Sequence, residues 1–188
     1  IGSKGVLTAT SANISNQTGQ IQGLDHLNLT AGNGSTTGTI NNTGGLIRSA
    51  ITANINAGEV NNSTTSGNSQ GIEGQDVSIA TAKLNNNTGA IRANNNVSVT
   101  SAGTVDNTSG LISAGNELIL QDAQAQASRT LAITNKDGTL IADKILTVTA
   151  SSLGGDGKVL SKNDLSVTLN TDFSNSGQVI ANHNVALT

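Results

Sequence analysis

The side chains that could bind a metal ion or carry a proton are few in this chain. The sequence has two histidines, His26 and His183, and no cysteine. Two histidines can share a zinc ion or act together only where they lie close to each other. They stand near opposite ends of the chain, about 30 Å apart in the repeat described below, so we expect each to be a solvated surface residue.

Carboxylates could perform general acid and base catalysis on a polysaccharide. Four of them occupy similar places in the repeat without falling in adjacent repeats: Asp25, Asp76, Glu117 and Asp164. Glycoside chemistry requires two such groups close together. Aromatic platforms for sugar rings are missing as well, since Phe173 is the only aromatic residue. We therefore expect no catalytic site and predict that the chain is not an enzyme.

One glycine-rich stretch partly matches a calcium-binding repeat. Residues 153–160 read L-G-G-D-G-K-V-L, which resembles the nonapeptide G-G-x-G-x-D-x-U-x of calcium β-rolls. Those sites need the turn many times in succession, because adjacent turns share each ion. Here the turn occurs once, so we expect a plain corner and no metal ion or cofactor.

The elements that must position these residues come from a repeat that runs through the whole chain. It is clearest at residues 86–100, N-N-T-G-A-I-R-A-N-N-N-V-S-V-T. An aliphatic residue follows each repeat's glycine, and we call it the anchor. The nine anchors are Ile1, Ile21, Ile47, Ile72, Ile91, Ile112, Leu140, Val159 and Val179.

Two further apolar series accompany the anchors. An apolar pair lies six and eight residues after most anchors, as at Val97 and Val99, although the register is ambiguous between Ile47 and Ile55. A third apolar position precedes the next anchor, as at Leu84 and Val105. Alternation of apolar and polar residues is strand periodicity. Three short strands per repeat predict an all-β fold, a parallel β-helix of about nine rungs of roughly 20 residues.

Composition narrows the possible partners. The net charge is −3, which leaves no basic patch for nucleic acid. No apolar run approaches the ~20 residues of a membrane-spanning helix, so we expect no membrane insertion by this chain. Because Ile1 already stands in mid-repeat, we predict that residues 1–188 form a single β-helix segment of a longer filament.

Asparagines recur at one place in the repeat. Six of them form a predicted corner ladder: Asn16, Asn42, Asn62, Asn86, Asn107 and Asn135. Asparagine tolerates the left-handed backbone of a tight corner, and stacked amides can hydrogen-bond along the stack. The alternative is glycosylation, because Asn16, Asn86 and Asn107 stand in N-x-[ST] patterns. Counting back from the last two anchors places Gly154 and Ser174 where asparagine is expected.

Insertions lengthen three repeats at turns, namely residues 31–39, 63–69 and 121–130. Loops on such scaffolds often carry a binding surface. The first two are small and polar, and we expect them to be neutral. The third contains helix-forming Ala and Gln and is the candidate contact loop, with these members singled out: Gln121, Asp122, Gln124, Gln126 and Arg129.

The residue after each anchor should point outward. In three consecutive rungs this position holds Arg48, Glu73 and Arg92, which predicts a surface charge ladder, with a ligand site as the alternative. In the last three rungs the same position holds an apolar column: Ile141, Leu160 and Ile180. Either this column faces outward and packs under a neighbouring segment of the parent protein, or those rungs slip by one residue and it belongs to the core.

These residues resemble a known family of repeats. The pattern N-x-x-G-x-I-x-[AS]-x-x-x-L-x-L, present from Asn86 and again from Asn107, is similar to the haemagglutinin repeats of bacterial two-partner secreted exoproteins. That group includes filamentous haemagglutinin-like adhesins and contact-dependent growth-inhibition toxins. The resemblance covers essentially the whole chain.

The resemblance implies a right-handed β-helix and a secreted filament on the surface of a Gram-negative cell. It implies export through an outer-membrane two-partner secretion transporter and projection of a receptor-binding region or a toxin toward a target or host cell. From the residues and the resemblance together, we expect a stalk segment. The alternative is a β-helix protein that binds or processes polysaccharide.

Overall fold

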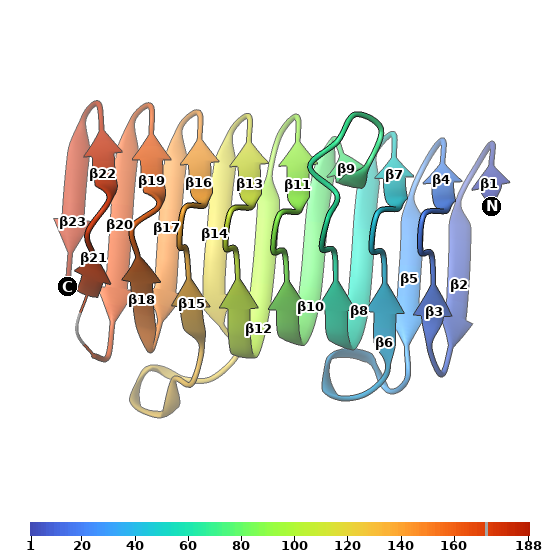
Figure 1. The fold of residues 1–188 in the computed structure, drawn as a ribbon, viewed down its shortest axis with the longest axis horizontal. Helices are drawn as coiled ribbons and strands as arrows, with labels where there is room; N and C mark the ends of the chain where they lie inside the picture. Colours follow the sequence, from blue (N-terminus) through green and yellow to red (C-terminus); the bar gives the residue numbers. More distant parts are fainter. Residues whose placement is uncertain (172) are drawn as a thin grey trace.

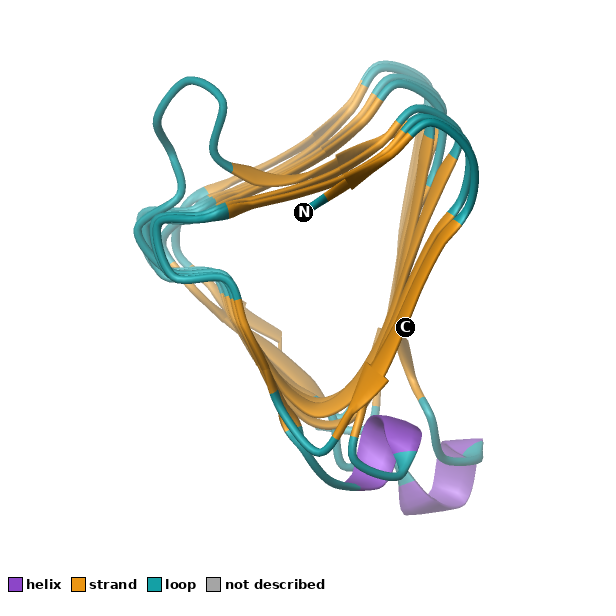
Figure 2. Ribbon diagram, turned by 90° about the vertical axis from the view of Figure 1, so that its right-hand side faces the viewer, coloured by secondary structure: helices purple, strands orange, loops and turns teal. Residues whose placement is uncertain are grey.

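The chain winds into a three-sided parallel β-helix with about nine turns of about 21 residues each (Figures 1 and 2). The computed structural model describes residues 1–171 and 173–188. Viewed along its axis, the molecule is a triangle whose sides are stacked strands and whose corners are turns (Figure 2). The fold predicted from the repeat is therefore confirmed.

The first side carries the anchors on nine parallel strands in the order β1-β4-β7-β9-β11-β13-β16-β19-β22. Each strand pairs with the one a full turn later, so that Ile91 lies between Ile72 and Ile112. The strands are β1 (Gly2–Ser3), β4 (Gln20–Gly23), β7 (Leu46–Ser49), β9 (Gly71–Gly74), β11 (Ala90–Ala93), β13 (Leu111–Ala114), β16 (Thr139–Ala142), β19 (Lys158–Ser161) and β22 (Gln178–Ala181).

The second side carries the apolar pairs, again on parallel strands. They are β2 (Leu7–Ser11), β5 (Leu27–Ala31), β8 (Thr52–Asn61), β10 (Asp76–Asn85), β12 (Val97–Asp106), β14 (Glu117–Asp122), β17 (Ile145–Ala150), β20 (Asp164–Leu169) and β23 (Asn184–Leu187). Shorter strands form the third side: β3 (Ile14–Ser15), β6 (Thr39–Asn41), β15 (Ala132–Thr134), β18 (Ser152–Gly155) and β21 (Phe173–Asn175).

The expectation of three separate strands per rung is wrong for the middle of the molecule. There β8, β10 and β12 each continue from the second side onto the third as one ten-residue strand. Their pairing survives the corner, with one register shift between Thr81 and Lys83 against β12. Hydrogen bonding therefore joins the second and third sides into one sheet of 14 strands.

The core is the set of inward columns, which are almost entirely aliphatic. Anchors from Ile21 to Val159 are buried, and the third apolar column stacks with Leu84 between Val60 and Val105. The ambiguous rung is resolved, because Ala53 and Ile55 face inward whereas Ile51 is 43% exposed. Stacked aliphatic columns and interstrand hydrogen bonds together hold such a rod.

The three insertions leave the columns intact and project at corners. Two contain a single turn of 3₁₀ helix, η1 (Gly34–Thr36) and η2 (Gln126–Ser128). Both leave the corner between the second and third sides (Figures 1 and 2). The remaining insertion lies before β9, at the corner between the third and first sides (Figures 1 and 2).

Candidate functional site

The six predicted asparagines form one continuous hydrogen-bonded ladder inside the corner between the third and first sides. The Nδ2 of each of the first five donates to the Oδ1 of the asparagine in the next rung. The distances are 2.7 Å for Asn16–Asn42, 2.8 Å for Asn42–Asn62, 2.8 Å for Asn62–Asn86, 2.7 Å for Asn86–Asn107 and 2.8 Å for Asn107–Asn135. All six side chains are buried.

The same amides also fasten the corner to the first side. Asn62 Nδ2 donates to the carbonyl oxygen of Ala90 at 2.9 Å, and Asn86 Nδ2 to that of Leu111 at 3.2 Å. Each amide therefore donates to a backbone carbonyl at the beginning of the anchor strand that lies one turn later.

The left-handed backbone lies two residues after each asparagine, and not at the asparagine as we expected. Thr88 has φ 48° and Ser109 has φ 52°, and Gly44 occupies the equivalent place with φ 62°. The asparagine itself points inward, where its amide bonds to the ladder. The chain then turns the corner toward the first side, and the left-handed residue lies in the middle of this turn.

The repeat has a glycine at this place because neighbouring atoms approach its backbone closely. A Cβ atom on Gly89 would overlap the carbonyl oxygen of Asn62 and lie 2.5 Å from Oδ1 of Asn86. Gly110 meets the same obstacles from Asn86 and Asn107. The glycine is needed because the ladder amide occupies the space that a side chain would fill.

The ladder is interrupted after Asn135. Strand pairing places Gly155 and then Asn175 above it, which corrects the expectation of Gly154 and Ser174 at these places. Gly155 has φ 125° and no side chain to continue the ladder. The amide atoms of Asn175 are buried without a hydrogen-bond partner among the described residues.

Glycosylation is poorly compatible with this geometry. The N-x-[ST] asparagines of the ladder, Asn16, Asn62, Asn86 and Asn107, are at most 6% exposed. Their Nδ2 atoms, where a glycan would be attached, already donate to the next rung. The geometry favours the ladder over the glycan alternative.

The candidate contact loop is shorter than its predicted bounds. Gln121 and Asp122 are the last residues of β14. The carboxylate of Asp122 closes the loop, because it accepts hydrogen bonds from the backbone N–H groups of Gln124 and Thr130 at 2.8 and 2.6 Å. Asp122 therefore holds the loop in place, a role that depends on where the loop returns and that the sequence alone did not indicate.

The loop leans over later turns. Gln124 and Gln126 are exposed, and Arg129 is partly exposed. Arg129 Nη1 donates to Oδ1 of Asn170 at 3.2 Å, and Nδ2 of Asn170 donates to the carbonyl oxygen of Gln126 at 2.7 Å. The loop thus presents polar side chains from a fixed base.

The histidines and the four carboxylates do not form a shared site. His26 lies 3.5 Å from Asp25, and His183 Nδ1 lies 2.8 Å from Oδ1 of Asp164 at the other end of the rod. The hydrogen bonds from His183 and then Asn184 hold the pKa of Asp164 below its ordinary value. Residues 1–171 and 173–188 contain no cluster of three or more metal-binding side chains of the His, Asp or Glu type.

Asp76 belongs to an arrangement that sequence reasoning missed. Its Oδ1 accepts hydrogen bonds from Nδ2 of Asn95 and Asn96, at 2.9 and 3.0 Å. Nδ2 of Asn116 then donates to Oδ1 of Asn96 at 2.7 Å. This forms a second, partly exposed polar ladder at the corner before the second side. The recurring amides at this place in the repeat were the available signal.

The glycine-rich stretch forms a corner of the β-helix. It covers the end of β18, the turn and β19, and Oδ1 of Asp156 accepts a hydrogen bond from the backbone N–H of Asp137 at 2.8 Å. The Asp156 carboxylate thus serves the adjacent turn. In the described residues there is no helix of the length and hydrophobicity that a membrane crossing requires.

The outward column after the anchors has the predicted register. Arg48 pairs with Glu73, and Arg92 lies on the other side of Glu73. Ile141, Leu160 and Ile180 also face outward, because their neighbours Leu140 and Val159 are fully buried. The apolar column is therefore a surface feature and the rungs do not slip.

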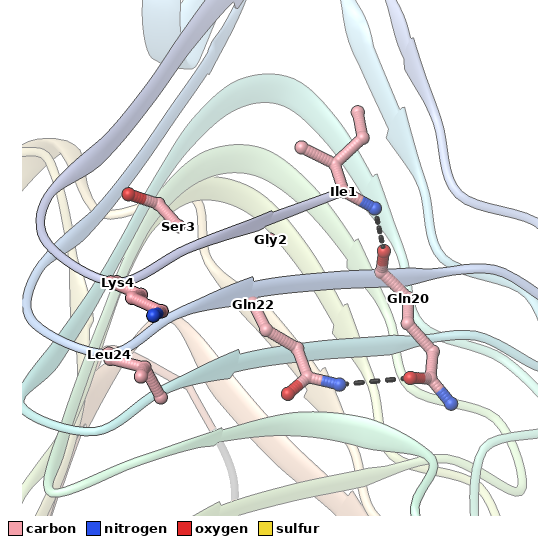
Figure 3. Close-up of a pocket in the computed structure, with 7 residues that line it drawn as sticks. All are labelled: Ile1, Gly2, Ser3, Lys4, Gln20, Gln22 and Leu24. Atoms are coloured by element: carbon pink, nitrogen blue, oxygen red, sulfur yellow. Dashed lines mark hydrogen bonds between the residues drawn. The ribbon is translucent and has the colours of Figure 1, made fainter.

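A hollow lies beside β1 (Figure 3). It is lined by Ile1, Gly2, Ser3, Lys4, Gln20, Gln22 and Leu24. The amine of Ile1 donates to the carbonyl oxygen of Gln20 at 2.7 Å. The lining contains neither a carboxylate side chain nor a histidine.

Comparison with known proteins gave no relative. No family model, no curated protein and no solved structure matches the chain. The functional assignment therefore depends on the repeat, the β-helix and its surface.

Proposed function

We propose that this chain is a structural stalk segment of a secreted filamentous protein on the outside of a Gram-negative cell, either an adhesin or a contact-dependent toxin-delivery exoprotein. The parent chain would be exported by an outer-membrane two-partner secretion transporter. The segment would act by spanning distance and contributes no catalysis. Its partner would be a receptor on a target or host cell.

The observation that carries the proposal is the continuous stacking of the first side. Nine strands pair in parallel from β1 to β22 without an interruption. At ~4.8 Å per rung this is a rod of roughly 40 Å. Interstrand hydrogen bonds along its length, the buried asparagine ladder and a polar exterior suit a stiff, soluble spacer better than an enclosed active site.

The contact loop is the part of the rod that we assign to receptor binding. The exposed Gln124 and Gln126 and the partly exposed Arg129 project from a base closed by Asp122. The loop that contains η1 leaves the same corner, is polar, and provides a matched comparison. Receptor binding is therefore expected to depend on one loop and not on the other.

Binding of the labelled 188-residue chain to intact bacteria and to epithelial cells tests the proposal. Variants in which residues 123–129 or residues 33–37 are replaced by a short Gly-Ser turn separate the two loops. Saturable binding that is lost only with residues 123–129 would support receptor contact. Equal loss with both replacements would refute the assignment to this loop, and absence of binding would leave the spacer role alone.

The spacer role has its own test. Electron microscopy of the parent filament, with this segment deleted in frame, should show a filament shorter by roughly 40 Å. Unchanged length would contradict the stalk function whatever the cells bind.

A further inference from the structure

A hollow on the outer face of the first side is lined by three charged side chains. It has a volume of about 380 Å³ and lies over β7, β9 and β11. The residues that line it are Arg48, Ser49, Ala50, Glu73, Gly74, Gln75, Arg92 and Asn94. Sites for small ligands begin at about 300 Å³, so the space is sufficient for one sugar unit.

Two guanidinium groups are held in place by one carboxylate. Arg48 donates through Nε and Nη2 to Oε2 of Glu73, at 2.9 and 2.6 Å. Arg92 Nη1 donates to Oε1 of Glu73 at 3.3 Å. The three side chains carry a net charge of +1 in a protein whose net charge is −3. The hollow therefore attracts an anion more than its surroundings do.

The projecting loop before β9 fixes the second arginine. Arg92 Nη1 donates to the carbonyl oxygen of Gln70 at 3.1 Å, and Nη2 donates to that of Ser66 at 3.4 Å. Arg48 has no such contact, and its Nη1 donates no hydrogen bond to any described residue. Arg48 thus offers an unused, oriented donor at the hollow.

The rest of the lining suits hydroxyl groups. The side-chain amides of Gln75 and Asn94 line the hollow and can both donate and accept hydrogen bonds. Glu73 can accept hydrogen bonds from hydroxyls. One excess positive charge is too little for the repeated phosphates of a nucleic acid.

We propose that this hollow binds a carboxylate-bearing sugar unit of an acidic polysaccharide. The sugar carboxylate would accept hydrogen bonds from Arg48, since guanidinium groups match carboxylates in geometry. Glu73, Gln75 and Asn94 would bind the ring hydroxyls. This binding proposal is independent of the proposed stalk function, because a spacer can act without binding a ligand.

Isothermal titration calorimetry of the whole chain tests the site. The probes are trisaccharides of galacturonate, of glucuronate and of a sialylated glycan, each compared with its methyl ester. We expect saturable binding of at least one acid and a loss of about tenfold or more in affinity for its ester, which corresponds to one charge-assisted hydrogen bond. The variant Arg48→Gln should lose affinity to the same extent.

The matched control is Lys83→Gln. Lys83 pairs with Glu59 at 3.1 Å on β10 and β8, away from the hollow. Its replacement removes the same charge and should leave affinity unchanged, with thermal unfolding used to confirm that both variants are folded. Absence of saturable binding to all three acids, equal binding of the esters, unchanged affinity of Arg48→Gln, or an equal loss in Lys83→Gln would each overturn the proposal.

Discussion

Nδ2 of Asn86 donates a hydrogen bond of 2.7 Å to Oδ1 of Asn107, 21 residues further along the chain. Both side chains are fully buried. The contact repeats in each turn from Asn16 to Asn135, and every amide in between is both donor and acceptor. Such a chain of amides fixes the register of successive rungs, because a slip of one residue would leave each buried amide without its partner.

Replacement of Asn86 by Ala should therefore be costly. It removes the acceptor of Asn62 and the donor of Asn107, and leaves the carbonyl of Leu111 without its side-chain partner. We expect the free energy of unfolding to fall by about 2 to 4 kcal/mol. Chemical denaturation followed by circular dichroism measures it. Asn87→Ala is the control, since the side chain of Asn87 is outside the ladder, and an equal loss there would contradict a special role for the ladder.

The glycine that accompanies the ladder yields a second prediction. In Gly89→Ala the new methyl group would overlap the carbonyl oxygen of Asn62 and the amide of Asn86. Since both belong to the buried corner, neither can move away easily, and we expect a loss of about 3 kcal/mol in the free energy of unfolding. Gly5→Ala provides the comparison, because no atom lies within 4 Å of a Cβ atom there. Similar losses in the two variants would show that close packing is not the reason for Gly89.

The sequence was sufficient to predict the columns of the β-helix. Period-two alternation identifies the inward residues, and the fixed distance from anchor to pair assigns Val97 and Val99 to the second side. The repeated asparagine indicates a ladder because only stacked, identical amides satisfy one another in this way. These features are periodic, so each rung supports the assignment of the next.

Features that depend on a single rung could not be predicted in this way. Counting back five residues from Val159 and Val179 gave Gly154 and Ser174, but the last two corners are one residue shorter, and pairing selects Gly155 and Asn175. The sequence also gave no sign that Asp122 closes the contact loop, since that depends on where Thr130 returns. Only three-dimensional pairing reveals such contacts.

The outward position of the apolar column predicts that two leucines differ strongly in their contribution to the free energy of unfolding. Leu153 is fully buried in the third apolar column, whereas Leu160 faces outward and is partly exposed. Leu153→Ser should cost about 4 kcal/mol in the free energy of unfolding, because it leaves a cavity and buries a hydroxyl. Leu160→Ser should cost less than about 1 kcal/mol. Parallel denaturation curves measure both, and a large loss in Leu160→Ser would place the column in the core.

Acid should weaken the C-terminal turn through Asp164. The hydrogen bonds from His183 and then Asn184 lower the folded-state pKa of this carboxyl below its ordinary value of 3.8. A lowered pKa means that the folded state favours the carboxylate. The stabilisation is therefore complete above about pH 4 and is lost as the pH falls through the folded-state pKa.

Titration of the Asp164 side chain by NMR measures this pKa directly. We expect a value below 3.8 in the native protein and a rise toward 3.8 in His183→Ala, because that variant removes the first of the two hydrogen-bond donors. Asn184→Ala should raise the pKa by a smaller amount, since its hydrogen bond is the second cause. Asp143 is the control, because its partner is Lys162 at 2.7 Å and neither variant changes that pair. A pKa of Asp164 that stayed the same in His183→Ala would show that the 2.8 Å contact does not hold the carboxylate in solution.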